Sequence, residues 1–168
     1  MNSSVNPPPI PGVESKTIST IRRILFATLL LGTAGILAEL FLLEHTEGFW
    51  QQVPLYLLGV GLAALTWHGA DQRAASVRLV QGVMLLFVAS GAIGTVLHYK
   101  GNMDFELEMD AASQGFKLFR EAMMGATPAL APGAMVQLGL MGLAYTFRHP
   151  ALALGRAASG RAESERSQ

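Results

Sequence analysis

Long blocks of apolar residues, separated by short polar segments, dominate the pattern along this chain. A helix needs about 20 mostly apolar residues to cross the roughly 30 Å hydrocarbon core of a bilayer. Blocks that meet this requirement cover approximately residues 24–43, 53–70, 79–99 and 130–147. Because unpaired backbone groups are costly in lipid, each block is predicted to be a helix. The pattern therefore predicts an all-α membrane protein, a bundle of four transmembrane helices in contact with the lipid bilayer.

The longest polar interruption, residues 100–127, is too long for a simple connection and is predicted to contain secondary structure. Its second half, residues 113–125, is predicted to form a short amphipathic helix lying in the membrane interface. The apolar side would consist of Phe116, Leu118, Phe119 and Met123, and the polar side of Lys117, Arg120 and Glu121. Ser113 is expected to cap the N-terminus of this helix.

The first half of the same loop contains the stretch MDFELEMD, residues 103–110, in which apolar residues alternate with carboxylates. A period of two is typical of a half-buried strand. In a strand, Asp104, Glu106, Glu108 and Asp110 would share one face toward water. A lone strand needs a partner for its backbone, so continuation of the preceding helix is the alternative that remains open.

The two ends of the chain differ from the apolar blocks. Residues 1–20 contain a proline-rich run that favours a solvated polyproline II conformation. Within residues 150–168, the part 157–168 is small, polar and charged and has no apolar face. Both are predicted to be disordered tails, which leaves residues 21–149 as the membrane domain.

Composition supports the membrane assignment, since 51% of the residues are hydrophobic and only 14% are charged, against about 25% in soluble domains. The formal net charge of zero conceals an uneven distribution. With the N-terminus inside, the inner segments hold Lys16, Arg22, Arg23, Arg73, Arg78, Arg148, Arg156, Arg161 and Arg166, and the outer segments hold Lys100, Lys117 and Arg120. The positive-inside rule then predicts that both termini are cytoplasmic, at the plasma membrane, and that the long loop is extracytoplasmic.

Several kinds of chemistry are excluded by the residues themselves. The chain has no cysteine, which excludes disulfides, thiolate catalysis and cysteine-ligated metals. It has no phosphate-binding loop, no HExxH or GxSxG motif and no basic nucleic-acid patch. We therefore predict no cofactor and no nucleic-acid partner, and we favour a non-catalytic protein over an intramembrane enzyme.

Polar residues within the predicted spans are few and indicate a candidate site. Glu39, His98 and Gln137 lie in the outer layer of the first, third and fourth spans. A carboxylate beside an imidazole in a low-dielectric pocket can hold a proton or a divalent cation, and an interhelical hydrogen bond is the structural alternative. His45, His68 and His149 follow or close other spans, where we expect them to cap helix C-termini.

The acidic residues of the long loop allow more than one interpretation. Asp104, Glu106, Glu108 and Asp110 can form a solvated face, a docking surface for a basic partner or a cation site. Acids two apart on a strand are separated by about 6.6 Å, whereas Ca²⁺ lies about 2.3–2.6 Å from its ligands, so all of them cannot share one ion.

The functional prediction is a structural or accessory protein that docks a partner, either another protein or a second copy of this chain. The alternative is proton- or cation-linked binding or transport through Glu39, His98 and Gln137. Small residues are expected to allow close helix packing, including the pairs Gly59/Ala63 and Ser90/Gly94 together with Gly139 and Gly142.

Overall fold

The computed structural model describes residues 15–155, of which 81% are helical, and no strand occurs in this range. Its helices are α1 (Lys16–Leu42), α2 (Phe49–Ala70), α3 (Ala74–Met109), α4 (Gly115–Met123) and α5 (Gly133–Thr146). Of these, α1, α2 and α3 are long and apolar enough to cross a membrane. The prediction of an all-α protein with membrane-spanning helices is confirmed at this level.

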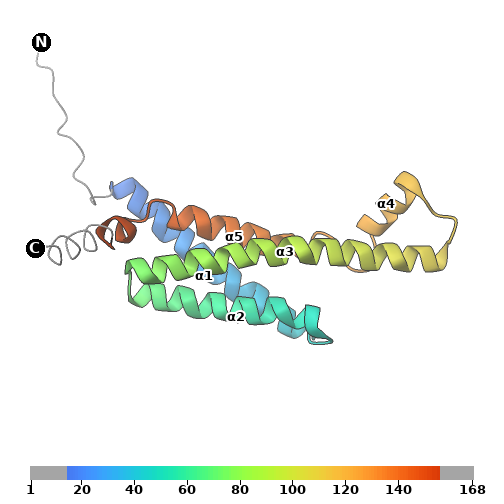
Figure 1. Cartoon of the computed structure of the whole chain (residues 1–168), viewed down its shortest axis with the longest axis horizontal. Helices are drawn as coiled ribbons and strands as arrows, with labels where there is room; N and C mark the ends of the chain where they lie inside the picture. The colour runs from blue at the N-terminus through green and yellow to red at the C-terminus, as the bar shows by residue number, and fades with distance from the viewer. Residues whose placement is uncertain (1–14, 156–168) are drawn as a thin grey trace, which may run out of the picture.

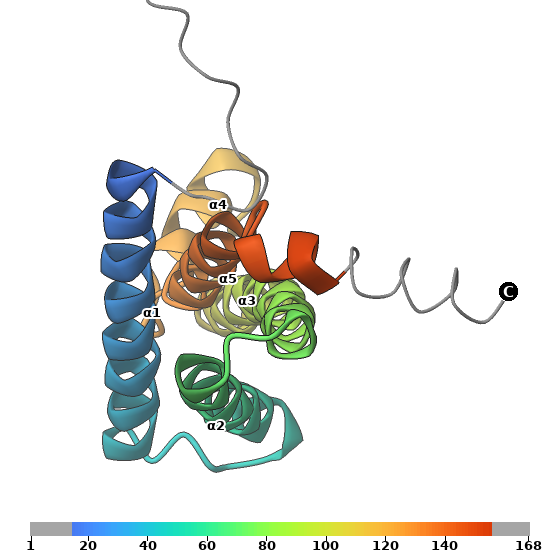
Figure 2. The ribbon, with the colours of Figure 1, turned by 90° about the vertical axis from the view of Figure 1, so that its left-hand side faces the viewer.

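The helices are arranged around α3, which contacts α2, α4 and α5. Figure 1 shows α2, α3 and α5 running side by side, with α3 extending well beyond the others. The end view in Figure 2 shows α1 crossing this group obliquely on one side, where it contacts α2 and α5. The starts of α1 and α3 and the ends of α2 and α5 therefore meet at one end of the bundle (Figure 1).

The core is apolar and lies between α1, α2, α3 and α5. Its fully buried side chains include Leu29, Leu58, Leu65, Met84 and Phe87. The ring of Phe87 fills the space beside Gly61, where an added Cβ would lie 2.4 Å from the ring edge. Burial of each such side chain stabilises the fold by about 1.5–3 kcal/mol.

Glycines allow α3 and α5 to pack closely. A Cβ on Gly91 would lie 2.7 Å from the carbonyl oxygen of Pro132, and one on Gly139 would lie 2.6 Å from that of Met84. Both neighbours are backbone atoms, which cannot move aside as the end of a side chain can. Close approach of this kind is how small residues join membrane helices, and it fixes α5 against the centre of the bundle.

The stretch MDFELEMD belongs to α3, so its interpretation as a strand is wrong and the helix alternative is correct. Continuing the helix satisfies the backbone internally, whereas a strand would need a partner that residues 15–155 do not contain. Successive residues in a helix are about 100° apart, so acids two apart point in nearly opposite directions. The single acidic face expected of a strand is therefore not formed.

Helix α4 folds back against the projecting part of α3. It is preceded by Gln114 rather than Ser113, and its first residue, Gly115, has φ +63°, a conformation that favours glycine. Ser113 is buried, and its hydroxyl donates a hydrogen bond to the Glu121 carboxylate at 3.2 Å. Of the expected apolar side, Phe116 and Phe119 remain 79% and 48% exposed, and the placement of this helix in the membrane interface stays a prediction.

Helix α5 has 14 residues and is about 21 Å long, which is shorter than the expected span 130–147. Backbone hydrogen bonds of the i+3 to i type precede it, beginning with Ala131 N–H to the Pro128 carbonyl. After Thr146 the chain turns and is helical again over residues 150–155. Helix α1 begins within the expected N-terminal tail, and the remainder of the two expected tails, residues 1–14 and 156–168, lies outside the described residues.

Candidate functional site

Glu39, His98 and Gln137 were grouped in the sequence analysis by their depth along the predicted spans. Glu39 and Gln137 are exposed, whereas His98 is half-buried with its Nδ1 3.3 Å from the carbonyl oxygen of Pro128. Within residues 15–155, no hydrogen bond or ion pair joins these side chains, and no group of three or more metal-ligating residues is positioned to hold an ion. A role for the three in proton or cation binding stays a prediction.

His98 has a histidine neighbour in the segment between α1 and α2. The pKa of His45 is lowered, first by partial burial and second by the positive charge that His98 carries when protonated. Burial and a nearby like charge both disfavour the protonated form of His45. This pair is a local feature of the end of the bundle from which α3 projects.

The acidic residues at the end of α3 fall into different environments. Asp104 and Glu108 are exposed, whereas Glu106 lines a cavity of about 320 Å³ together with Arg120 and Glu121. Asp110 forms an ion pair with Lys117, whose Nζ lies 2.9 Å from its Oδ2. The hydrogen bond from Lys117 lowers the pKa of Asp110, with smaller contributions from the Ala112 N–H and the lysine charge.

Asn102 joins α3 to the last turn of α4 and to the segment that follows α4, a role that the sequence did not reveal. Its Nδ2 donates to the carbonyl oxygens of Ala122 at 2.9 Å and Thr127 at 2.6 Å. Its Oδ1 accepts hydrogen bonds from the Thr127 hydroxyl at 2.6 Å and the Thr127 N–H at 3.3 Å. Gly125 leaves room for it, since a Cβ there would lie 2.6 Å from Asn102 Cγ. The sequence feature that could have indicated this role is the isolated amide side chain of Asn102 after a long apolar run.

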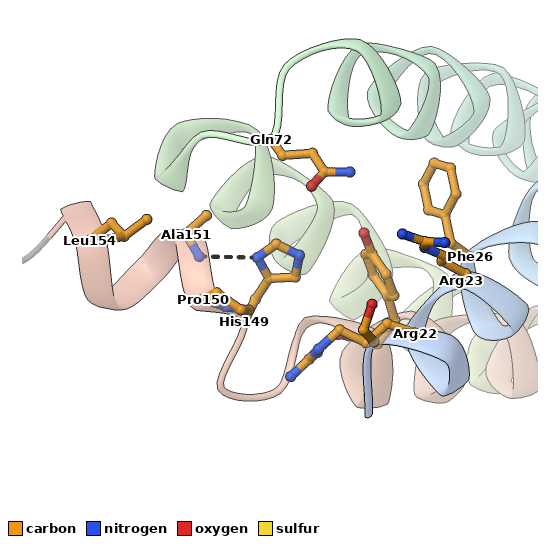
Figure 3. A pocket seen from close by; sticks show the side chains of 10 residues that line it. Arg22, Arg23, Phe26, Gln72, His149, Pro150, Ala151 and Leu154 are labelled. Carbon is orange, nitrogen blue, oxygen red and sulfur yellow. Dashed lines mark hydrogen bonds between the residues drawn. The ribbon is translucent and has the colours of Figure 1, made fainter. Parts of the chain in front are cut away.

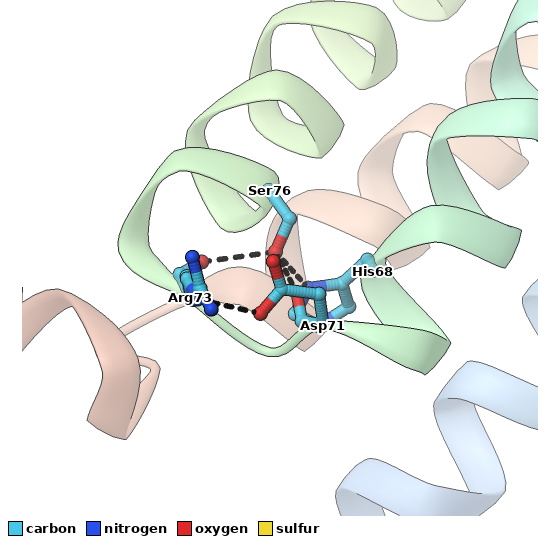
Figure 4. Close-up of polar contacts among 4 residues, drawn as sticks. All are labelled: His68, Asp71, Arg73 and Ser76. Atoms are coloured by element: carbon cyan, nitrogen blue, oxygen red, sulfur yellow. Dashed lines mark hydrogen bonds and ion pairs between the residues drawn. The ribbon is translucent and has the colours of Figure 1, made fainter.

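At the opposite end of the bundle, His68 lies in a buried polar cluster. The ring is fully buried, with Nδ1 2.9 Å from Ser76 Oγ and Nε2 2.7 Å from the Tyr145 hydroxyl. Ser76 Oγ also lies 2.5 Å and 2.9 Å from the carbonyl oxygens of Asp71 and Arg73 (Figure 4). A hydroxyl has one hydrogen, so Ser76 donates to a carbonyl and accepts from His68 Nδ1–H. Tyr145 then donates to Nε2.

This network gives His68 a different role from the helix cap that its position suggested. One imidazole links the end of α2, the start of α3 and the end of α5 through two hydrogen bonds. Because the ring is closed off from solvent and both nitrogens are used, it is suited to holding helices together rather than to acid–base chemistry.

Around this cluster, aromatic rings and an arginine tie α1 to the end of α5. The ring centroid of Tyr145 lies 5.4 Å from that of Phe26 and 5.6 Å from that of His149. The Arg22 guanidinium donates hydrogen bonds to the carbonyl of Tyr145, to that of Phe147 at 2.9 Å and to that of Arg148 at 3.3 Å. These carbonyls lie at the C-terminus of α5, where a cation is favourable.

A cavity of about 330 Å³ opens beside this cluster. Its lining includes Arg22, Arg23, Phe26, Gln72, His149 and Leu154, and no carboxylate of residues 15–155 belongs to it. Figure 3 shows Arg23 and His149 on different sides of the space, with Gln72 directed toward it. The cavity is therefore positively charged, with apolar patches in its wall.

No family model, curated protein or solved structure matches this chain. The two ends of the bundle differ in composition. One end, which we call the basic end, contains Arg22, Arg23, Arg73, Arg78 and Arg148. At the other, the projecting part of α3 and α4 form what we call the α3–α4 hairpin, residues 100–123.

Proposed function

We propose that this chain is a membrane protein with four crossings that docks a protein partner through the α3–α4 hairpin, without catalysing a reaction. The observation that carries the proposal is the length of α3, 36 residues or about 54 Å. A bilayer core needs only about 30 Å of helix. The excess projects from the bundle (Figure 1), and crossing the membrane does not require it.

The fourth crossing is supported by the turns that precede α5. Residues 128–132 continue the helical course through i+3 to i hydrogen bonds and add about 10 Å at roughly 2 Å per residue. Together with α5 this makes about 31 Å, close to the thickness of the hydrocarbon core. Four crossings with the basic end in the cytoplasm would leave both termini inside and the α3–α4 hairpin outside.

The hairpin is braced, which suits a docking element. Asn102 fixes the end of α4, Ser113 bonds to Glu121, and Lys117 pairs with Asp110. A surface that is already ordered loses less conformational entropy when a partner binds. The bracing therefore favours recognition by a preformed surface over a loop that orders on contact.

The exposed residues of the hairpin combine carboxylates with large apolar groups. Asp104 and Glu108 are exposed, and next to them Phe105 and Met109 are 52% and 73% exposed. Buried aromatic and methionine side chains contribute much of the affinity of protein interfaces, while charges around them favour a partner of opposite sign. The partner expected here is a basic protein segment that also presents apolar side chains.

Charge reversal tests this proposal in the native membrane. A photo-reactive residue replaces Phe105 in the full chain, and cross-linked products are identified by mass spectrometry. We expect a specific cross-link to another polypeptide that D104K/E108K removes. The matched control is E44K/E47K, which reverses two acids in the α1–α2 connection and should leave the product unchanged. Cross-links to lipid alone, or a protein product insensitive to D104K/E108K, would contradict the proposal.

A further inference from the structure

We propose that the cavity at the basic end binds the phosphate group of an anionic phospholipid. It is an approximately 330 Å³ space formed by the start of α1, the α2–α3 connection and the segment after α5. This site is separate from the α3–α4 hairpin, so either proposal can fail without the other.

The charge of the cavity fits a phosphate. Arg22 and Arg23 both line it, and no aspartate or glutamate in the described part of the chain does. The neighbouring Asp71 is ion-paired with Arg73 at 3.0 Å. Within residues 15–155, Arg23 itself has no hydrogen bond or ion pair to a protein group. A guanidinium binds phosphate through two parallel hydrogen bonds, so Arg23 is the residue we assign to the ligand. Arg22 contributes charge while its N–H groups hold the end of α5.

The remaining wall suits a lipid rather than a free phosphate ion. Phe26 and Leu154 line the same space, and Leu154 is 64% exposed. A free phosphate ion offers nothing apolar to cover these groups, whereas a phospholipid carries glycerol and acyl carbons directly beside its phosphate. Gln72 supplies an amide for the ester or headgroup oxygens (Figure 3).

The position of the cavity relative to the membrane also supports a phospholipid as its ligand. Arg23 directly precedes the apolar run that begins at Ile24, which places its guanidinium where lipid headgroups lie. Basic pockets between membrane helices on the cytoplasmic side are known to bind anionic headgroups. The same location would expose the cavity to lipids diffusing along the bundle.

The test is native mass spectrometry of the purified full chain in detergent, titrated with phosphatidylglycerol or phosphatidylcholine. We expect phosphatidylglycerol to bind more tightly. R23Q should weaken this binding about tenfold through loss of a charge-assisted contact, and Q72E should weaken it by placing a carboxylate in the cavity. The matched control R78Q removes an exposed arginine that does not line the cavity and should change binding less than twofold.

Competition with inorganic phosphate distinguishes the two sources of the ligand. Failure of millimolar phosphate to displace phosphatidylglycerol supports the lipid. If phosphate at that concentration displaces phosphatidylglycerol, and R23Q loses binding, the cavity is a site for soluble phosphate and the lipid assignment is overturned. Equal binding of the two lipids, or equal effects of R23Q and R78Q, would overturn the phosphate site itself. Circular dichroism of R23Q, whose side chain is exposed, checks that its fold is retained.

Discussion

The two ends of this molecule use polar residues in opposite ways. At the basic end, His68, Ser76 and Tyr145 are buried and bonded to one another, and they come from three different helices. In the α3–α4 hairpin, most polar side chains are exposed, and the contacts join only α3, α4 and the segment that follows. A hydrogen bond matters most where its loss strands a buried partner. The basic end should therefore govern the stability of the bundle, and the hairpin only its own position.

The largest expected effect is that of H68A. Removing the ring leaves a cavity and takes away the hydrogen bonds that the buried Tyr145 and Ser76 hydroxyls make with it, so we expect a loss of about 3–4 kcal/mol in unfolding free energy. Thermal or denaturant unfolding in detergent measures it. H98A makes the same truncation at a half-buried ring with one 3.3 Å contact and should lose far less. Similar losses of stability in both variants would contradict the claim that the basic end governs the stability of the bundle.

N102A should have the next largest effect, and a local one. The variant loses the hydrogen bonds to Ala122 and Thr127, which we expect to loosen α4 by about 2–3 kcal/mol. Hydrogen exchange followed by mass spectrometry should show faster exchange in residues 111–127 and unchanged exchange in α2. Q137A removes an exposed amide and serves as the control. Faster exchange throughout the bundle would contradict the division between the two ends.

Y145F isolates a single hydrogen bond of the basic end. It keeps the packed ring and removes the hydroxyl that His68 Nε2 accepts from, so we expect a loss of about 1 kcal/mol in global stability. Y99F alters a half-buried tyrosine toward the other end of α3 and should be neutral. Equal stability of Y145F and the unaltered chain would show that the bond contributes nothing net.

The smallest expected effect is the pH dependence of the hairpin. The folded pKa of Asp110 lies below its ordinary value because of Lys117, so its stabilising contribution is complete above about pH 4 and is lost as pH falls through the lower folded value. The pKa of Lys117 is raised by the same contact, and its contribution is complete below about pH 10 and is lost as pH rises further. Hydrogen exchange of residues 110–117 at several pH values, after correction for intrinsic rates, should show this window. K117Q should remove the alkaline limit and weaken the acid one, because the Ala112 N–H still donates to the Asp110 carboxylate.

Apolar run length predicted where the long helices lie but not how far they extend, since α3 continues ten residues beyond the expected span 79–99, to Met109. The expected span 53–70 ends at the same residue as α2, and the expected span 24–43 ends one residue beyond α1. The packing of Gly94 and Gly139 against neighbouring helices was predictable from their size, whereas Gly59 has nothing within 4 Å of an added Cβ. Residue size indicates which positions permit close approach but not which helix arrives there.

The polar clusters could not be predicted for a related reason. Glu39, His98 and Gln137 were grouped by depth along their spans, and depth gives no information on the direction in which a side chain points. His68 and Tyr145 are 77 positions apart, and only the arrangement of α2 beside α5 brings them together. The stretch MDFELEMD was predicted wrongly because its alternation fits a strand. The chain before it was already helical, and α3 continues into it.

The unbroken course of α3 has a mechanical consequence. One continuous helix of about 54 Å connects the buried polar cluster around His68 to the α3–α4 hairpin. Ser76, which bonds to His68, and Asn102, which bonds to α4, both belong to this helix. The longer part of the helix, up to at least Gly94, is packed against its neighbours, since an added Cβ at Gly94 would lie 2.9 Å from Pro132, and only its last part projects. A tilt of the whole helix by about 5° would carry Met109 sideways, relative to the first turn, by about 5 Å over that length. A small rotation of α3 within the bundle would thus become a larger displacement at the hairpin.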